Sequence, residues 1–187
     1  MSSLDSYWNQ YAEDFATNYN EEMAKFIRDL ALSLRVSNML EIGCSAGNDL
    51  RLFPSDFDVN GIDQSEFAVN IAQKNLPAFK FNTASASTIP FDDSSVDFVF
   101  TRNMLNYIES SDVEKIIKEL YRVSKKYILN IERFANDEIL LDDEKIPAWG
   151  RNMKKRWMNF RVKIISSVEM HEEIDPKKST FTLIRKI

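Results

Sequence analysis

The amino-acid sequence predicts an α/β fold: a Rossmann-like, doubly wound sheet of five parallel strands plus a C-terminal antiparallel hairpin, with helices on both faces. Short apolar runs with strand character alternate with segments of helical spacing, which is typical of parallel strands joined by right-handed crossovers. A glycine-containing turn ends the first of these runs. Two alternating segments near the C-terminus have no helix between them, so they should pair antiparallel.

The N-terminal part of the chain predicts helix before the first strand. Residues 4–35 carry apolar side chains three or four positions apart, with a break at residues 18–20. The period then changes, and short apolar runs follow. The runs that predict the parallel strands are residues 38–43, 59–63, 79–81, 96–101 and 127–132.

A helix should follow the glycine turn after the first strand, and two further helices between the strands have start signals in the sequence. Ser65 is placed to be the N-cap of a helix that continues to Asn75. Residues 110–112 should cap a second helix, because an apolar stripe at helical spacing follows them. The stripe consists of Val113, Ile116, Ile117, Leu120 and Val123.

The pattern changes after the fifth strand. Residues 135–150 predict a long acidic loop, and residues 153–158 predict a short basic helix. Residues 160–168 and 180–187 then alternate with strand period on either side of a turn. These two segments predict the closing hairpin.

Composition excludes several kinds of site and partner. The formal net charge of −5 argues against general affinity for nucleic acid. The single cysteine, Cys44, rules out an internal disulfide and favours a reducing compartment, and with the single histidine, His171, it rules out zinc sites built from Cys and His clusters. No targeting signal and no apolar run of about 18 residues occurs, so we expect a soluble cytoplasmic protein without a metal ion.

The turn after the first predicted strand carries the main chemical signal. Gly43 allows a sharp turn and Gly47 allows a close approach of backbone or ligand. Asp63 ends the second predicted strand, 20 residues after Gly43. Doubly wound nucleotide-binding folds place a carboxylate there against ribose hydroxyls, because a carboxylate accepts both protons of a diol.

Four segments in order resemble the class I S-adenosylmethionine-dependent methyltransferases. Residues 39–47 (Met-Leu-Glu-Ile-Gly-Cys-Ser-Ala-Gly) look like the first motif of this family, and residues 61–65 resemble the second. Residues 89–99 are similar to the stretch before the family's fourth strand, and residues 119–123 match its Glu-x-x-Arg-Val. The resemblance covers about residues 39–131 and implies S-adenosylmethionine as cofactor and S-adenosylhomocysteine as product.

The resemblance also implies roles for single residues. Glu41 would order the glycine turn, Asp63 would hold the ribose hydroxyls, and Gln64 would flank the adenine. Thr101 and Arg102 would lie beside the sulfonium. The full set implied for cofactor binding is Glu41, Gly43, Cys44, Gly47, Asp63, Gln64, Ser85, Ala86, Thr101 and Arg102.

The chain departs from the family pattern at three places. Ser45 replaces the middle glycine of the turn, Ser85 replaces the usual adenine-binding aspartate, and residues 123–127 lack the usual Pro-Gly-Gly turn. These departures leave open a methyltransferase-fold protein with a degenerate cofactor site that serves as a binding partner. In either case we expect one domain over residues 1–187. It divides into an N-terminal helical cap (1–36), a cofactor-binding core (37–134) and a C-terminal loop, short helix and hairpin (135–187).

On the acceptor side, candidates follow the carboxyl ends of the fourth and fifth strands, where open α/β sheets bind ligands. Glu132 and Arg133 follow the fifth strand. The catalytic candidates are Tyr107, Arg133 and His171. The substrate-binding candidates are Tyr19, Asn103, Asn106, Tyr107 and Arg133. Tyr19 also belongs to an aromatic series with Tyr7, Trp8 and Tyr11, which is either a lid over the cofactor or core packing.

A small-molecule acceptor is favoured, with methyl transfer to one of its oxygen or nitrogen atoms. A narrower resemblance, carried by residues 97–101, 107–108 and 120–129, is to pseudaminic acid biosynthesis-associated methylases and implies a sugar or glycan precursor. The alternative is an RNA methyltransferase that uses the basic residues 154–161. A basic face that balances the preceding acidic loop is the simpler interpretation of those residues.

Overall fold

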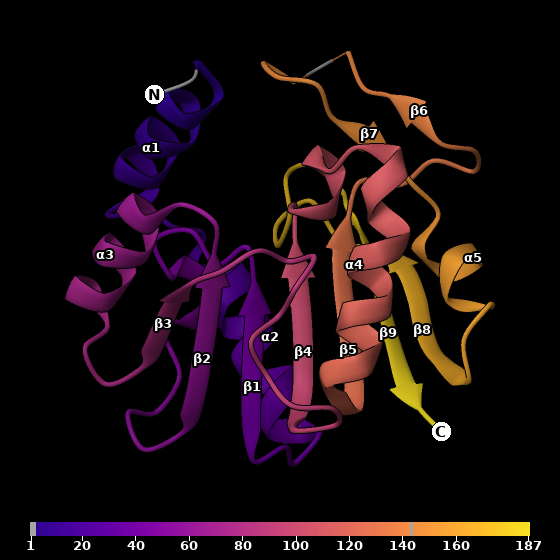
Figure 1. The fold of residues 1–187 in the computed structure, drawn as a ribbon, viewed down its shortest axis with the longest axis horizontal. Coiled ribbons are helices and arrows are strands. Elements are labelled where there is room, and N and C mark those ends of the chain that lie inside the picture. Colours follow the sequence, from indigo (N-terminus) through magenta and orange to yellow (C-terminus); the bar gives the residue numbers. More distant parts are fainter. Residues whose placement is uncertain (1–2, 143) are drawn as a thin grey trace. The chain divides into compact units, whose positions relative to one another are not determined.

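The computed structural model describes residues 3–142 and 144–187, and the chain forms two compact units (Figure 1). Unit 1 is Met1–Pro90 and unit 2 is Phe91–Ile187. In the part of the chain that the structure describes, no helix is long and apolar enough to cross a membrane.

Unit 1 is a three-stranded parallel sheet with helices. Its elements in chain order are α1 (Ser3–Phe15), α2 (Glu21–Ser33), β1 (Asn38–Ile42), the 3₁₀ helix η1 (Asn48–Leu50), β2 (Asp58–Asp63), α3 (Glu66–Asn75) and β3 (Lys80–Thr83). The strand order is β3-β2-β1, and each neighbouring pair is parallel. The three strands expected in this part of the chain are thereby confirmed.

The helix boundaries of unit 1 follow from local capping. The side chain of Asn20 accepts the Met23 N–H at 3.0 Å and starts α2, which confirms the expected break between α1 and α2. Ser65 Oγ accepts the Ala68 N–H at 3.2 Å and starts α3, as expected. The apolar faces of α2 and α3 are buried in the core of the unit.

The connection from β1 to β2 differs from the expected strand–turn–helix. After the glycine turn the chain forms only the three-residue η1 instead of an α-helix. Pro54 follows closely; proline lacks an N–H and disfavours helical backbone at the residue before it. The glycine turn is therefore followed by a compact loop.

Unit 2 contains the remaining strands and two helices. Its elements are β4 (Val96–Arg102), the 3₁₀ helix η2 (Leu105–Tyr107), α4 (Ser110–Val123), β5 (Ser124–Glu132), β6 (Ile139–Leu140), β7 (Trp149–Gly150), α5 (Met153–Trp157), β8 (Val162–Glu169) and β9 (Thr180–Lys186). β4 and β5 are parallel, and β9 pairs antiparallel with both β5 and β8. The expected closing hairpin is therefore β8–β9, joined to β5 through β9.

Two details of unit 2 correct the expectations. The N-cap of α4 is Glu109, whose side chain forms no capping hydrogen bond. The helix begins at Ser110, so the expected cap residues 110–112 lie in its first turn. The expected apolar stripe of α4 is buried. Residues 135–150 are not only a loop: Ile139 pairs with Gly150 and Leu140 with Trp149 to form the β6–β7 ladder. Two residues a strand are too few to leave a period in the sequence.

Candidate functional site

The turn after β1 uses left-handed backbone at three alternate residues. The φ angles are 77° at Gly43, 47° at Ser45 and 75° at Gly47. Glycine adopts this region freely, whereas a side chain there costs about 1–2 kcal/mol. The N–H groups of Gly43 and Cys44 both donate to Ile62 O, at 2.8 and 3.0 Å. The turn is therefore fixed to the end of β2.

Glycine is also required where this turn packs against the sheet. A Cβ at Gly61 would lie 2.8 Å from Phe81 Cδ1 and 2.9 Å from Cys44 Sγ. A Cβ at Gly47 would lie 3.0 Å from Leu76 Cδ1. The backbone at Gly61 and Gly47 is thus in close contact with neighbouring side chains, and this packing restricts the conformation of the turn.

Asp63 stands at the carboxyl end of β2 and faces the same turn. Its Oδ2 accepts the Ser45 N–H and its Oδ1 accepts the Ser65 N–H, both at 2.9 Å. Burial raises the pKa of Asp63, while backbone N–H groups of Ser65, Ser45 and Gln64 lower it. A carboxylate has about four lone-pair positions, so Asp63 retains acceptor capacity for a ligand hydroxyl group beside these backbone groups.

Cys44 is an inert member of the turn. Its side chain is buried, and burial together with the carboxylates of Glu41 and Asp63 raises the pKa of the thiol well above its usual range. The thiol therefore stays protonated and contributes no nucleophile. Glu41 is itself buried in β1.

Three further residues implied for the cofactor lie on loops that leave β2 and β3: Gln64, Ser85 and Ala86. The Ala84 N–H donates to Asp63 O at 2.9 Å, so the loop after β3 starts beside Asp63. Ser85 Oγ accepts the Ser87 N–H at 3.2 Å and lies 3.0 Å from Ser87 Oγ. The hydroxyl that replaces the usual aspartate is thus part of a local turn.

An aromatic series runs along α1. Neighbouring ring centroids in this series lie 5.0, 5.6 and 4.5 Å apart, and the residues are, in order, Tyr7, Trp8, Tyr11 and Phe15. Ser65 Oγ donates to Asn9 Oδ1 at 3.1 Å and ties α1 to the start of α3, which lies next to it in Figure 1. Tyr19 lies outside this series, under the Arg51 guanidinium at 5.0 Å from its ring centroid.

Unit 2 contains a network of buried polar side chains joined by hydrogen bonds. The indole N–H of Trp157 donates to Asn130 Oδ1 at 2.6 Å, and Asn130 Nδ2 donates to Thr101 Oγ1 at 2.8 Å. Thr101 Oγ1 donates in turn to Glu132 Oε1 at 2.7 Å. The other oxygen of Glu132 accepts the Asn106 N–H at 3.3 Å. The Thr101 side chain, implied for the cofactor, is fully buried and committed to this network.

Glu132 and Arg151 both bind backbone at η2: Glu132 accepts from N–H groups, and Arg151 donates to carbonyl groups. Burial raises the pKa of Glu132 to about 7, and hydrogen bonds from Thr101 and from backbone N–H groups at η2 oppose that shift. Arg151 is equally buried, and its guanidinium donates to Leu105 O and, at 2.6 Å, to Ile108 O. The segment after β4 is therefore fixed by a carboxylate and a guanidinium.

Several of the expected acceptor-side residues lie close together after the carboxyl ends of β4 and β5. Arg102 is the last residue of β4. Asn103 has a left-handed φ of 48°, and its Oδ1 accepts from Asn106 Nδ2 at 3.2 Å and from Ser179 Oγ at 3.4 Å. Asn106 Oδ1 accepts the Arg133 N–H at 3.0 Å. The structure thus brings Asn103, Asn106 and Arg133 together.

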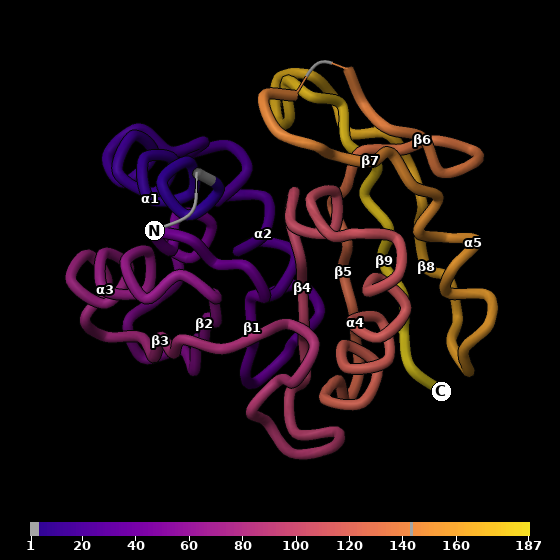
Figure 2. The backbone as a smooth tube through the Cα atoms, turned by 45° about the horizontal axis from the view of Figure 1, so that its top comes forward, coloured from indigo at the N-terminus to yellow at the C-terminus, as the bar shows by residue number. Residues whose placement is uncertain are grey.

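Glu144 joins two of the three catalytic candidates. Its Oε2 accepts from the Tyr107 hydroxyl at 3.0 Å, and its Oε1 lies 3.3 Å from Arg133 Nη1 and also pairs with Lys177 Nζ. In Figure 2 the orange residues 144–148, which lead into β7, lie beside the yellow turn between β8 and β9, in agreement with the Lys177 contact. Sequence reasoning missed Glu144 and Lys177, because neither belongs to a motif.

The third catalytic candidate, His171, lies elsewhere in unit 2. It belongs to the turn between β8 and β9, its side chain is 67% exposed, and its Nδ1 accepts the Glu173 N–H at 3.3 Å. Among the described residues, Glu144 binds Tyr107, Arg133 and Lys177 and leaves His171 outside the cluster.

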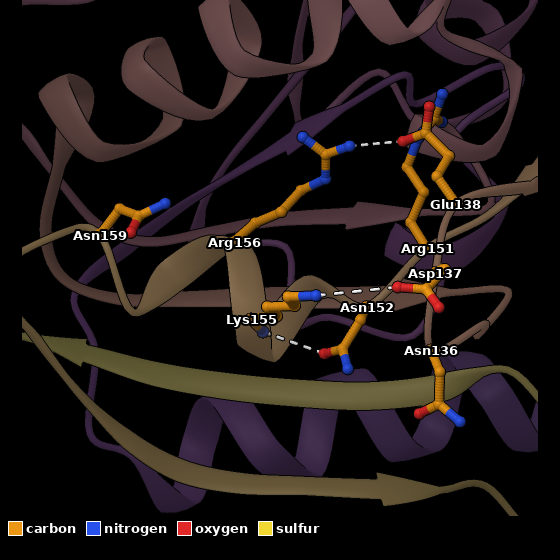
Figure 3. A pocket seen from close by; sticks show the side chains of 8 residues that line it. All are labelled: Asn136, Asp137, Glu138, Arg151, Asn152, Lys155, Arg156 and Asn159. Carbon is orange, nitrogen blue, oxygen red and sulfur yellow. Dashed lines mark hydrogen bonds and ion pairs between the residues drawn. The ribbon is translucent and has the colours of Figure 1, made fainter.

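A polar pocket of about 270 Å³ lies beside α5 (Figure 3). Its lining residues are Asn136, Asp137, Glu138, Arg151, Asn152, Lys155, Arg156 and Asn159. Glu138 Oε2 pairs with Arg151 at 2.7 Å and with Arg156, and Asp137 lies 3.8 Å from Lys155 Nζ. The basic helix thus pairs with the acidic loop before it.

Comparisons with known proteins point to methyltransferases. A model of a methyltransferase domain matches residues 39–127, from β1 to β5. An uncharacterized methyltransferase, YcgJ, of Bacillus subtilis is 27% identical over 129 residues, which are 62% of this chain and 50% of that protein. Phosphoethanolamine N-methyltransferase 2 of Caenorhabditis elegans is 28% identical over 133 residues, 66% of this chain and 30% of that protein. The chain therefore spans half the length of the first of these relatives and less of the second.

The fold comparison agrees with the sequence matches. The crystal structure of a SAM-dependent methyltransferase from Methanosarcina mazei has a TM-score of 0.67 at 21% identity, and the likeness covers 80% of this chain and 92% of that one. Such a likeness shows the Rossmann-like fold. The domain match over residues 39–127 and the fold likeness together support the class I S-adenosylmethionine-dependent methyltransferase family.

Proposed function

We propose that the chain binds S-adenosylmethionine in unit 1 and transfers its methyl group to an oxygen or nitrogen atom of a small-molecule acceptor. The observation that carries the proposal is the pairing of Asp63 with the glycine turn. Its carboxylate is oriented by two 2.9 Å backbone bonds and keeps acceptor capacity for a ribose hydroxyl. The family match runs from β1 in unit 1 to β5 in unit 2, so we treat both units as parts of one methyltransferase domain.

The residues of the turn fit this cofactor. Backbone at Gly43, Cys44 and Gly47 would surround the methionine and ribose, as the resemblance implies. Gly43 and Gly47 have left-handed φ values and no side chain, so a ligand can approach their backbone closely. Glu41 would orient the turn from β1. Gln64 and the loop at Ser85 would border the adenine. The Ser85 hydroxyl is a weaker acceptor than the carboxylate it replaces.

Bound S-adenosylmethionine supplies an electrophilic methyl group on a positively charged sulfur. The protein's own part is to hold the acceptor within attack distance and to exclude water. An amine or a carboxylate needs no strong base for this displacement, whereas a hydroxyl benefits from one. We propose that unit 2 supplies the acceptor contacts, with Asn103, Asn106, Tyr107 and Arg133 as the residues involved.

The name of one relative and the charge pairing of the basic segment both favour a small acceptor. One relative is named for N-methylation of phosphoethanolamine. The resemblance to pseudaminic acid biosynthesis-associated methylases makes sugar derivatives the second class to assay. Lys155 and Arg156, the centre of the basic segment, face Asp137 and Glu138, which lowers their attraction for RNA phosphates.

Calorimetric titration with S-adenosylmethionine and with S-adenosylhomocysteine tests the proposal. We expect saturable binding of both. Absence of saturable binding up to millimolar cofactor would overturn the enzyme and favour the degenerate, partner-binding alternative. Salt-sensitive RNA binding that is lost when Lys154, Lys155 and Arg156 are changed to Gln would favour the RNA methyltransferase instead.

A further inference from the structure

We propose that Arg133, Lys177 and Tyr107 form a receptor for an anionic group of the methyl acceptor, a carboxylate or a phosphate, and that the Glu144 carboxylate occupies this receptor in the structure. The inference rests on the proposed function and deepens it, because it states the charge of the acceptor.

The bonds around Glu144 are those of a bound anion. Both of its oxygens are used: Oε1 lies 3.3 Å from Arg133 Nη1 and also contacts Lys177 Nζ, and Oε2 accepts the Tyr107 hydroxyl at 3.0 Å. The side chains of Glu144 and Arg133 are 9% and 18% exposed. Arginine, lysine and tyrosine donors that converge on one point are the usual means of holding a carboxylate or phosphate.

The charges favour an anion over an amine in this place. Two cations face one carboxylate, so the cluster of Arg133, Lys177 and Glu144 carries a net positive charge. An ammonium group would have to approach both cations and share a carboxylate that they already occupy. A carboxylate or phosphate that takes the position of the Glu144 side chain keeps all three donors satisfied.

The Arg133 part of the receptor is fixed without Glu144. Its N–H donates to Asn106 Oδ1 at 3.0 Å, and its carbonyl accepts the Arg151 N–H at 2.8 Å. Tyr107 belongs to η2, which Glu132 and Arg151 hold through backbone bonds. Two of the three donors are therefore mounted on backbone that stays in place when Glu144 is changed.

The Lys177 part is fixed by a buried carboxylate. Asp175 is 1% exposed, and its two oxygens accept the Lys177 N–H at 3.3 Å and the Ser179 N–H at 2.9 Å. Its carbonyl accepts the Lys178 N–H at 2.8 Å. The turn that presents Lys177 thus has its own internal support.

The test compares anion binding by the full chain and by Glu144→Ala. Binding of inorganic phosphate and, separately, of acetate is followed by the shift of the thermal unfolding midpoint, with sodium chloride used to keep the ionic strength constant. The matched control is Glu172→Ala, which removes an exposed carboxylate that pairs with Lys178 at 2.8 Å. If Glu144→Ala does not unfold cooperatively, Glu144→Ser replaces it, because serine is likewise too short to reach the three donors.

We expect Glu144→Ala to bind phosphate, acetate or both at least about tenfold more tightly than the unchanged chain and Glu172→Ala, because the internal occupant is gone. Adding Arg133→Gln should abolish this gain. A preference for phosphate or for acetate identifies the acceptor group. Equal binding by Glu144→Ala and Glu172→Ala, or a gain that survives Arg133→Gln, overturns the inference.

Titration of the same variants with S-adenosylhomocysteine separates the two proposals. Cofactor binding without any gain in anion binding would mean that only the anion receptor is wrong. Loss of cofactor binding in the unchanged chain would mean that the proposed function is wrong, whatever the anions do.

Discussion

The backbone N–H of Ser45 donates to the Asp63 carboxylate at 2.9 Å, so the acid that ends β2 holds the turn at the position where the family usually has glycine. This bond has an effect on each of its two partners. It offsets part of the cost of a left-handed serine, whose φ is 47°, and it orients the carboxylate. The turn and the acid therefore act as one unit.

We expect Asp63→Asn to weaken S-adenosylhomocysteine binding by about 1–3 kcal/mol, measured by calorimetry. An amide retains only one oxygen, so one of the Ser45 and Ser65 N–H groups would face an NH₂ group and the diol would lose an acceptor. The control is Asp58→Asn at the opposite end of β2, where the carboxylate forms an exposed 3.0 Å pair with Lys80. If Asp63→Asn bound the product as tightly as Asp58→Asn, Asp63 would have no role in the cofactor site.

Two substitutions in the turn should affect stability differently. Gly47→Ala introduces a Cβ at a φ of 75° and 3.0 Å from Leu76 Cδ1, and it should lower the free energy of unfolding by about 1–3 kcal/mol. Ser45→Gly relieves a left-handed side chain but adds freedom to the unfolded chain, so it should change that free energy by less than about 1 kcal/mol. Urea denaturation measures both, and equal effects would contradict the backbone argument.

Glu132 should make stability depend on pH. Its pKa in the folded chain is about 7, above the ordinary value of 4.5, so between these values the folded chain holds a proton that the unfolded chain has lost. The free energy of unfolding should therefore fall as pH rises from about 5 to 7.5, by at most about 1.4 kcal/mol for each unit of the shift.

The variant Glu132→Gln isolates this effect, because glutamine does not titrate. Urea denaturation at several pH values should show the difference in unfolding free energy between the unchanged chain and Glu132→Gln moving in favour of the variant as pH rises. A difference that stays constant from pH 5 to 8 would mean that Glu132 is ionised in the folded chain throughout this range.

Trp157→Phe should lower the free energy of unfolding by about 1–3 kcal/mol, because it leaves buried Asn130 Oδ1 without the indole donor now at 2.6 Å. Trp149→Phe is the matched control: Trp149 is half-buried and lies under the Arg151 guanidinium at 5.2 Å. Urea denaturation of both variants checks the prediction. Similar losses in the two variants would show that ring volume, not the indole hydrogen bond, sets the cost.

The elements with a strong period were predictable from the sequence. The apolar stripe of α4 and the Ser65 cap of α3 depend on neighbours within a few residues, and each strand of the closing hairpin alternates along its own length, so local pattern reveals them. η1 was not predicted as such, because the expected helix is cut short by Pro54. The β6–β7 ladder escaped as well, since it has two residues on each side.

The same distinction applies to the candidate site: residues that belong to a motif could be predicted, and residues that meet only through tertiary contacts could not. Gly43, Gly47 and Asp63 belong to a motif, and the structure brings the turn and the acid together. Glu144 and Lys177 are 33 residues apart, and in the sequence each resembles the other charged residues of its loop. Contacts of this kind depend on how β5, η2 and the β8–β9 turn converge, which no local pattern records.

The Glu144 side chain is tethered to the residues it contacts, and this has a consequence for ligand discovery. A group held by the same chain competes as if present at an effective concentration of about a millimolar or more. Screens of anionic compounds at micromolar concentration would then miss acceptors that the receptor itself holds well. A library screened against the Glu144→Ala chain should recover carboxylate and phosphate compounds that the unchanged chain hides.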